Sequence, residues 1–247
     1  MVVRPVVVAL LAVFASDPAA AAETSVAVAA NFTEPAKAIA AAFVRATGDT
    51  ATLSFGASGA FYTQMTHGAP FEVFLSADAE RPAKLEADGL TVPGTRFIYA
   101  VGTLVLYSAT PGLVDAKGKV LTGGSFTHLA IADPAAAPYG VAAVETLKNL
   151  KLYDSDAPKF VTGSSIAQAY QFVATGAAEL GFVAASQVVD VPGGSRWMVP
   201  AKLHAPIEQA AVELKTGAAN PAAAAFIKFM RGPEARAIIR RYGYIIR

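Results

Sequence analysis

The segment FGASGA places the hydroxyl of Ser58 on a turn between a strand-like run and a helical pattern. It is close to the nucleophile elbow G-x-S-x-G of α/β-hydrolases, with Ala60 where the last glycine would stand. A triad in the hydrolase order would be Ser58, Asp133 and His204. Asp133 lies in a turn-like stretch, however, and no acidic residue adjoins His204 in AKLHAPI. A secreted serine hydrolase using Ser58 is therefore the less favoured alternative, and we predict that the protein is not an enzyme.

Metal and phosphate-loop chemistry have less support in the sequence. The three histidines, His67, His128 and His204, are isolated from one another, and there is no cysteine. They match neither the H-x-x-x-H nor the H-E-x-x-H spacing of metal sites. The segment GLVDAKGKV lacks the spacing of a phosphate loop and the Ser or Thr that follows its lysine. We expect no resident metal and no cofactor.

Four turns instead carry neutral hydrogen-bond donors at the start of a predicted helix. They are VAANFTEP around Asn31, FGASGAF around Ser58, DPAAAPYGVAA around Tyr139 and VTGSSIAQAY around Ile166. The first N–H groups of a helix have no partner within the helix, and anions bind there. Each turn alone is also explained as an ordinary helix start, because Ser, Asn and Gly are common at that position. Sequence does not show whether the four turns converge.

These turns contain almost no charge, and Glu34 is the one charged residue beside the candidate donors. Neutral N–H and O–H groups offer donors and few acceptors, so they favour a fully ionised anion over a protonated one. A hydrogen bond to a charged partner contributes about 1.5–3 kcal/mol, so about six give roughly 9 kcal/mol or more before the costs of association. Micromolar binding requires about 8 kcal/mol. Tight capture without a salt bridge is therefore physically reasonable.

The elements that would position these turns alternate between strand and helix. Strand-like runs at 25–30, 50–55, 71–78, 128–133, 159–163 and 179–188 alternate with helical patterns at 33–48, 59–67, 79–89, 140–150 and 166–175. This alternation predicts an α/β fold whose sheets are mainly parallel and flanked by helices. The long apolar run FIYAVGTLVLYS (97–108) is predicted to leave one sheet and enter another. Two C-terminal helices, broken by Gly232-Pro233, close the chain.

The N-terminus has the three parts of a secretory signal peptide. Arg4 precedes an apolar stretch at 5–14, and small residues end at Ala22, so we predict cleavage of residues 1–22 and a mature chain from Glu23. Setting aside Arg4 and Asp17, from totals of 20 and 19, leaves 19 basic and 18 acidic residues. This near-neutral balance does not indicate nucleic acid as a partner. Export without cysteines favours the periplasm.

The chain resembles the periplasmic molybdate-binding proteins, the solute-binding components of molybdate ABC importers. The resemblance is carried by VAVAANFTEPAKAIAAAF, SFGASGAFYTQMTHGAPFEVFLSADAERPAKLEADGL, ADPAAAPYGVAA, GSSIAQAYQFVATGAAELGFVAASQV and WMVPAKLHAPIEQAAVEL with the closing helices. It implies a two-lobed periplasmic-binding-protein fold of type II, with two crossing strands between the lobes. Residues 23–102 would form lobe 1, to which 206–247 return, and 103–205 would form lobe 2.

The resemblance also implies that the lobes close on molybdate or tungstate. Asn31 matches the residue after the opening strand, often Ser in the family, and its side-chain NH₂ would donate to the anion; Ala30 would offer a backbone N–H. Ser58 matches the second hydroxyl of the family, while Tyr139 and Ile166 match two turns that contribute backbone N–H groups. Molybdenum would then be present only inside the oxyanion, without direct protein ligands.

One position departs from the family pattern. Some members have a tyrosine ligand where this chain has Ala184, and we predict that the Tyr139 hydroxyl replaces it from the other side of the cleft. The resemblance implies a monomer that delivers its anion to the membrane permease of an ABC transporter. A sulfate- or phosphate-type carrier stays open as an alternative, because sequence does not reveal the size of the cavity.

Overall fold

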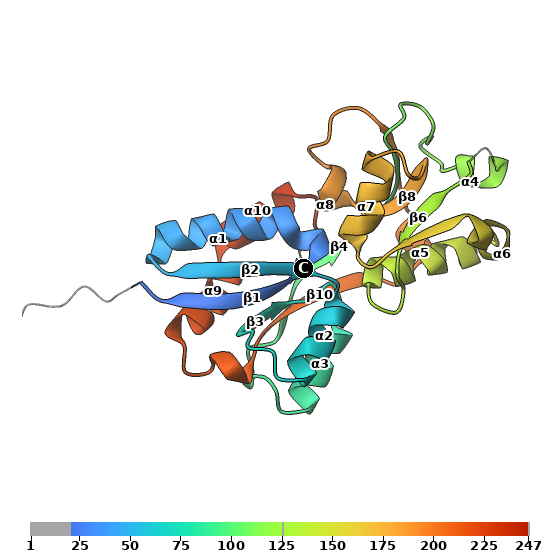
Figure 1. Cartoon of the computed structure of the whole chain (residues 1–247). Helices are drawn as coiled ribbons and strands as arrows, with labels where there is room; N and C mark the ends of the chain where they lie inside the picture. The colour runs from blue at the N-terminus through green and yellow to red at the C-terminus, as the bar shows by residue number, and fades with distance from the viewer. Residues whose placement is uncertain (1–20, 125, 247) are drawn as a thin grey trace, which may run out of the picture.

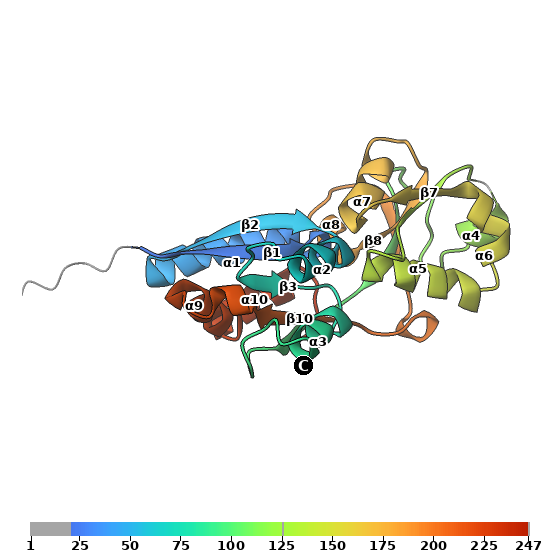
Figure 2. The same ribbon diagram turned by 60° about the horizontal axis from the view of Figure 1, so that its bottom comes forward.

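The structure, a computed structural model, describes residues 21–124 and 126–246. The chain forms two lobes, each built on one five-stranded sheet flanked by helices (Figure 1). The same two bodies lie side by side in a second view, with the helices of each lobe around its own sheet (Figure 2). Residues 1–20 of the predicted signal peptide lie outside the described residues. The α/β architecture predicted from the alternation is confirmed, and so are the two lobes that the family resemblance implies.

The first lobe has the strand order β2-β1-β3-β10-β4. Its strands are β1 (Glu23–Ala29), β2 (Thr50–Gly56), β3 (Val73–Leu75), β4 (Phe97–Gly102) and β10 (Ile207–Glu213). Its helices are η1 (Ala30–Phe32), α1 (Thr33–Thr47), α2 (Ser58–Thr66), α3 (Glu80–Ala87), η4 (Lys215–Gly217), α9 (Pro221–Met230) and α10 (Pro233–Arg241). Strand β1 pairs in parallel with β2 and β3, whereas β10 is antiparallel to both of its neighbours. Four strands of this sheet therefore point the same way.

The second lobe has the strand order β7-β6-β8-β5-β9. Its strands are β5 (Leu104–Ser108), β6 (Leu129–Ala132), β7 (Phe160–Gly163), β8 (Leu180–Ala184) and β9 (Ser195–Met198). Its helices are α4 (Val120–Gly123), α5 (Pro138–Asn149), α6 (Tyr153–Asp156), η2 (Ala157–Lys159), α7 (Ile166–Ala174), α8 (Ala185–Val188) and η3 (Ala201–Leu203). Here β5 is the reversed strand, because it is antiparallel to β8 and to β9. Both sheets are mainly parallel, as predicted.

The two passages between the lobes explain the reversed strands. The run 97–108 forms β4 and then β5, with Thr103 between them, so one extended segment leaves the first sheet and enters the second. The chain returns after β9 through η3 and enters the first sheet as β10. Strands β5 and β10 are the first strands that the chain forms after each passage. They therefore enter their sheets from the side of the other lobe and run against the remaining strands.

Separate apolar cores cover both faces of the first sheet. In β1, Val26 and Val28 face one core, which α1, α9 and α10 complete, while Ala27 faces a second core that includes Phe61 of α2 and Leu85 of α3. A strand buried on both faces has a continuous apolar sequence, as SVAVAA does. Both faces of β1 are therefore covered, and the chain continues from the carboxyl end of the strand into a helix.

The segment 179–188 differs from the predicted single strand. Strand β8 ends at Ala184, and α8 begins at Ala185. The side-chain oxygen Oε1 of Gln187 accepts a hydrogen bond of 2.9 Å from the N–H of Ala184. This bond closes the first turn of α8 and ends the strand, an effect that apolar periodicity does not register.

Candidate functional site

Four helix starts converge on one small cavity between the lobes. Its lining consists of Ala29, Ala30, Asn31, Gly56, Ala57, Ser58, Ala77, Ala137, Pro138, Tyr139 and Ile166. All five residues predicted from the sequence belong to this lining. Three of them come from the first lobe and two from the second. Its volume is about 10 Å³, far below the roughly 300–1,000 Å³ of pockets for drug-sized molecules. In this arrangement the lobes meet closely and leave only a small space between the helix starts.

Three of these helices begin without a side-chain cap. Helices η1, α2 and α5 follow Ala29, Ala57 and Ala137, none of which forms a side-chain cap. Alanine has no side-chain acceptor, so the first N–H groups of these helices are left to other partners. In α7, the Ser165 hydroxyl accepts from the N–H of Gln168, which leaves the N–H of Ile166 at the first position. The partial positive charge of each helix start adds to this preference for an anion.

The Ser58 hydroxyl is held in place by a hydrogen bond that it accepts. Ser58 is the first residue of α2 and is buried, and its Oγ accepts a hydrogen bond of 2.9 Å from the N–H of Ala77. A hydroxyl that accepts one bond still has its single proton to donate. The serine therefore presents a fixed donor in the cavity, beside the backbone N–H groups of the same turn.

The hydrolase alternative has no catalytic geometry in the described residues. Asp133 accepts a hydrogen bond from the N–H of Ala135 at 2.9 Å, which is a local turn interaction. The Nδ1 of His204 lies 2.7 Å from the carbonyl oxygen of Ala205, in a segment on the surface. The hydrogen bond recorded for the Ser58 side chain is with Ala77. Ser58 is therefore placed as a hydrogen-bonding group without a neighbouring base.

The side chain of Asn31 is oriented differently from the sequence expectation. Its Nδ2 donates to Oε1 of Gln209 and to the hydroxyl of Tyr244, both at 2.9 Å. Both protons of the amide group are thus used within the protein, and the group that remains for an anion is the backbone N–H at the start of η1. The Asn31 carbonyl oxygen accepts from Ser186 Oγ at 2.7 Å and from the Tyr244 hydroxyl at 2.8 Å.

The Tyr139 ring reaches from α5 toward the strands that join the lobes. Its hydroxyl accepts a hydrogen bond of 3.2 Å from Nε2 of Gln209 in β10. A Cβ atom at Gly102 would lie 2.1 Å from this hydroxyl, so only glycine leaves room for the ring. Ala184, where some relatives were expected to have a tyrosine, is buried at the end of β8. Tyr139 lines the cavity, and its hydroxyl bonds to Gln209. That this hydroxyl replaces a missing tyrosine ligand stays a prediction.

Burial raises the pKa of the three tyrosines around Gln209. The pKa values of Tyr99 and Tyr139 lie well above the ordinary value of 10.0, chiefly because burial disfavours the phenolate. For Tyr244 burial raises the pKa to about 12, although its hydrogen bonds with Ser186 and Asn31 oppose the shift. All three rings are therefore neutral hydrogen-bonding groups at physiological pH.

The raised pKa of Tyr244 predicts a loss of stability at alkaline pH. The folded protein holds this phenolic proton more tightly than the unfolded chain, so the linked stability is complete below the unfolded pKa of about 10 and is lost as pH rises toward about 12. We expect the free energy of unfolding, measured with urea across this range, to fall less steeply in Tyr244→Phe than in the unsubstituted protein. The half-buried Tyr62 provides a control as Tyr62→Phe. Equal slopes in all three proteins would contradict the assignment.

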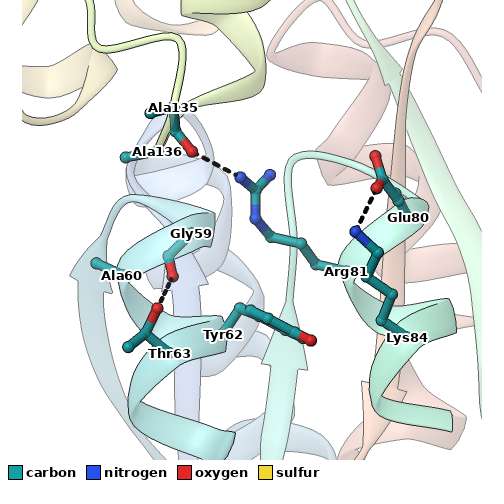
Figure 3. A pocket seen from close by; sticks show the side chains of 9 residues that line it. All are labelled: Gly59, Ala60, Tyr62, Thr63, Glu80, Arg81, Lys84, Ala135 and Ala136. Atoms are coloured by element: carbon teal, nitrogen blue, oxygen red, sulfur yellow. Dashed lines mark hydrogen bonds and ion pairs between the residues drawn. The ribbon is translucent and has the colours of Figure 1, made fainter. Parts of the chain in front are cut away.

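A second set of contacts joins the lobes at the rim of the cavity. The N–H of Gly59 donates to the carbonyl oxygen of Ala136 at 2.9 Å, and Nη2 of Arg81 donates to that of Ala135 at 3.1 Å. Figure 3 shows Arg81 extending from its helix toward the carbonyl of this turn, with Glu80 and Lys84 paired beside it. Arg81 also pairs with Asp78. These bonds are made between α2 or α3 of one lobe and the turn before α5 of the other, so they favour the closed arrangement.

The lining of the cavity carries no formal charge. None of its residues is Asp, Glu, Lys, Arg or His. Within residues 21–124 and 126–246, no group of three or more His, Cys, Asp and Glu is placed to hold a metal ion. The same part of the chain contains no helix with the length and apolar character needed to cross a bilayer. The cavity can therefore offer neutral hydrogen-bond donors, a chemistry that suits a small anion.

Sequence reasoning missed the side chains directly behind the lining. Gln209, Tyr244 and Ser186 bond to Asn31 across 178, 213 and 155 residues of chain. No local motif links positions so far apart. One signal was present for Gln209, which is a polar residue within the apolar strand IEQAAVE.

Comparisons with known proteins agree with the geometry of the cavity. Residues 24–245 match the family described as bacterial extracellular solute-binding protein. The chain is 60% identical over 228 residues to the molybdate-binding protein ModA of Rhodobacter capsulatus, covering 92% of this chain and 90% of that one. It is 55% identical over 241 residues to ModA of Azotobacter vinelandii, covering 96% of both. The solved periplasmic molybdate-binding protein of Azotobacter vinelandii superposes with a TM-score of 0.88 at 43% identity, covering 91% of this chain and 99% of that one.

Proposed function

Because this chain belongs to the bacterial extracellular solute-binding proteins, with ModA-type proteins among its relatives, we propose that it captures molybdate and delivers it to an ABC importer. The observation that carries the proposal is the convergence of four uncapped or ligand-facing helix starts, two from each lobe, on one uncharged cavity. The similarity to the relatives named for molybdate covers nearly the whole chain, including the segments that contain the lining residues.

The binding mechanism follows from the placement of the donors. Lobe 1 would offer the Ser58 hydroxyl and the N–H groups at Ala30, Asn31 and Ser58, and lobe 2 the N–H groups at Tyr139 and Ile166. An anion that receives hydrogen bonds from both lobes stabilises the closed arrangement over the open one. The extended passage through Thr103 and the return through η3 are the two segments in which the lobes would hinge.

We assign tungstate to the same site, because a tetrahedral dianion of nearly the same size and charge uses the same donors. The mature protein would begin at Glu23, act as a monomer in the periplasm without a cofactor and present its closed form to a membrane permease. Its lobes would divide at 102/103 and 205/206. The export pattern in residues 1–22 and the names of the relatives support this placement.

Calorimetric titration of residues 23–247 tests the proposal. We expect saturable heat with molybdate and tungstate at micromolar affinity or better, and none with equal concentrations of sulfate or phosphate. Sulfate and phosphate are smaller than molybdate, so they would not reach the donors of both lobes at once, and phosphate is also partly protonated at neutral pH. A blank titration with chloride at matched ionic strength serves as the control. If only sulfate or phosphate gave heat, the molybdate assignment would be wrong and the protein would be a sulfate- or phosphate-type carrier.

A further inference from the structure

Gln209 is a polar residue buried in the middle of β10. Its neighbours Ala210, Ala211 and Val212 are apolar, and all of them are shielded from solvent. The pairing of β10 with β4 shifts register between Gln209 and Ala210. A shift of this kind re-aims a side chain at one point of a strand. The irregular register therefore lies directly beside Gln209, whose buried side chain makes polar contacts.

The Gln209 amide bonds to groups from both lobes. Its Oε1 accepts from Asn31 Nδ2 and from the Tyr99 hydroxyl, each at 2.9 Å. Its Nε2 donates to the Tyr139 hydroxyl at 3.2 Å. Asn31 precedes α1 in lobe 1, Tyr139 belongs to α5 in lobe 2, and both line the cavity. One side chain thus fixes a lining residue from each lobe, without itself belonging to the lining.

The other partners of Asn31 complete this arrangement. The Tyr244 hydroxyl and Ser186 Oγ lie 3.0 Å apart, and both bond to the Asn31 carbonyl oxygen. Tyr244 is itself positioned by the bridge between Val101 and Ile245, whose backbones exchange two hydrogen bonds of 2.7 and 3.0 Å. Asn31 is therefore held on its side chain by Gln209 and Tyr244 and on its backbone by Ser186 and Tyr244.

We propose that Gln209 is a positioning residue for the anion site, which holds Asn31 and Tyr139 so that the N–H groups of the two lobes face one anion. Its bond to Tyr139 is made between lobes and is available only when they are closed. Removing the amide would leave the anion donors chemically intact but free to shift, and small shifts of donors cost affinity when the site depends on preorganised geometry. The inference rests on the proposed capture of molybdate.

The substitution Gln209→Glu tests the proposal through its pH dependence. A carboxylate still accepts from Asn31 and Tyr99, but it cannot donate to Tyr139, and it places a negative charge behind an anion site. We expect molybdate affinity to fall at least a hundredfold at pH values where the introduced carboxyl is ionised. Protonation of the carboxyl restores one donor, so affinity should recover at least tenfold as pH falls toward 6, while the affinity of the unsubstituted protein stays flat.

The groups that face Gln209 do not compete in this titration. Tyr99, Tyr139 and Tyr244 have pKa values raised by burial and stay protonated throughout the range. Asp78, on the connection that follows β3, pairs with Arg81. The introduced carboxyl is therefore the group whose protonation changes. Gln64→Glu, an exposed glutamine of α2, provides the matched control for an added charge.

A second variant separates positioning from folding. Gln209→Met fills a similar volume without hydrogen bonds, and we expect about a tenfold loss of affinity with little dependence on pH. In a Tyr139→Phe background the same substitution should cost less, because its partner is already absent, as a double-mutant cycle measures. Urea unfolding of the ligand-free variants checks that the chains are folded at the titration pH.

The outcomes distinguish the two proposals. Failure of the unsubstituted protein to bind molybdate would overturn the proposed function. Binding by the unsubstituted protein together with equal affinity in folded Gln209→Met and Gln209→Glu would overturn only the role of Gln209. A loss of affinity in Gln209→Glu that does not change with pH, or additive effects in the double-mutant cycle, would assign Gln209 to packing of the strand instead.

Discussion

We expect Ser58→Ala to weaken molybdate binding by roughly ten- to 150-fold, corresponding to about 1.5–3 kcal/mol for one hydrogen bond to a charged partner. The hydroxyl is buried, and its oxygen already accepts from the N–H of Ala77, so its proton is the part that is left to donate. The substitution removes that donor and leaves the Ala77 N–H without its acceptor, while the backbone N–H groups of α2 remain. Calorimetric titration of the two proteins with molybdate gives the ratio of dissociation constants.

Thr63→Ala is the matched control for Ser58→Ala. Thr63 lies one and a half turns further along α2, is exposed, and donates its hydroxyl to the Gly59 carbonyl within the same helix. It changes the same helix by the loss of one hydroxyl, without touching the cavity, and we expect its affinity to equal that of the unsubstituted protein. Unchanged affinity in a folded Ser58→Ala protein would show that the anion does not use this hydroxyl.

Ile166→Pro should have an effect of similar size through the backbone. Proline is accepted at the first position of a helix, and Ser165 already has the extended conformation that a residue before proline prefers. The substitution therefore removes the N–H of residue 166 with little change in the helix. Since the anion would lose one charged hydrogen bond, we expect affinity to fall roughly ten- to 150-fold, measured by titration with molybdate.

Ile166→Val separates the loss of the N–H group from the loss of apolar contact. Ile166 is buried in the core of the second lobe, so both variants lose packing. An Ile-to-Val change typically costs about 0.5–1.5 kcal/mol of stability and keeps the donor. We expect the valine variant to bind almost normally and the proline variant to bind weakly. Equal affinities in the two would place the anion away from the start of α7.

Much of the fold was predictable because its elements are local. Alternating apolar periods identified β1, α1, β2, α2, α5 and α7 within a few residues, and the unusually long run 97–108 indicated a passage between sheets. The end of β8 was not predictable from periodicity, since a side-chain bond from Gln187 to the Ala184 N–H decides it. Hydrogen bonds of this kind depend on rotamers, which the spacing of apolar residues does not encode.

The candidate site was predictable as a set of turns but not as a geometry. Each helix start followed from its own sequence, whereas their convergence depends on strand order in two sheets. The direction of the Asn31 amide depends on Gln209 and Tyr244, which approach it from distant parts of the chain. The Tyr139 hydroxyl likewise meets Gln209 because Gly102 leaves room for it. Donor chemistry was thus accessible from residue types, and donor direction was not.

The uncharged lining of the cavity has a consequence for how binding would depend on salt concentration. Salt screens exposed charges, and attraction between an anion and a basic patch weakens as ionic strength rises. Capture by N–H and O–H groups in a closed cavity has no such patch to screen. Added salt would therefore weaken capture less than it weakens binding to a basic patch, while the protein would lack the long-range steering that accelerates association with oppositely charged clefts.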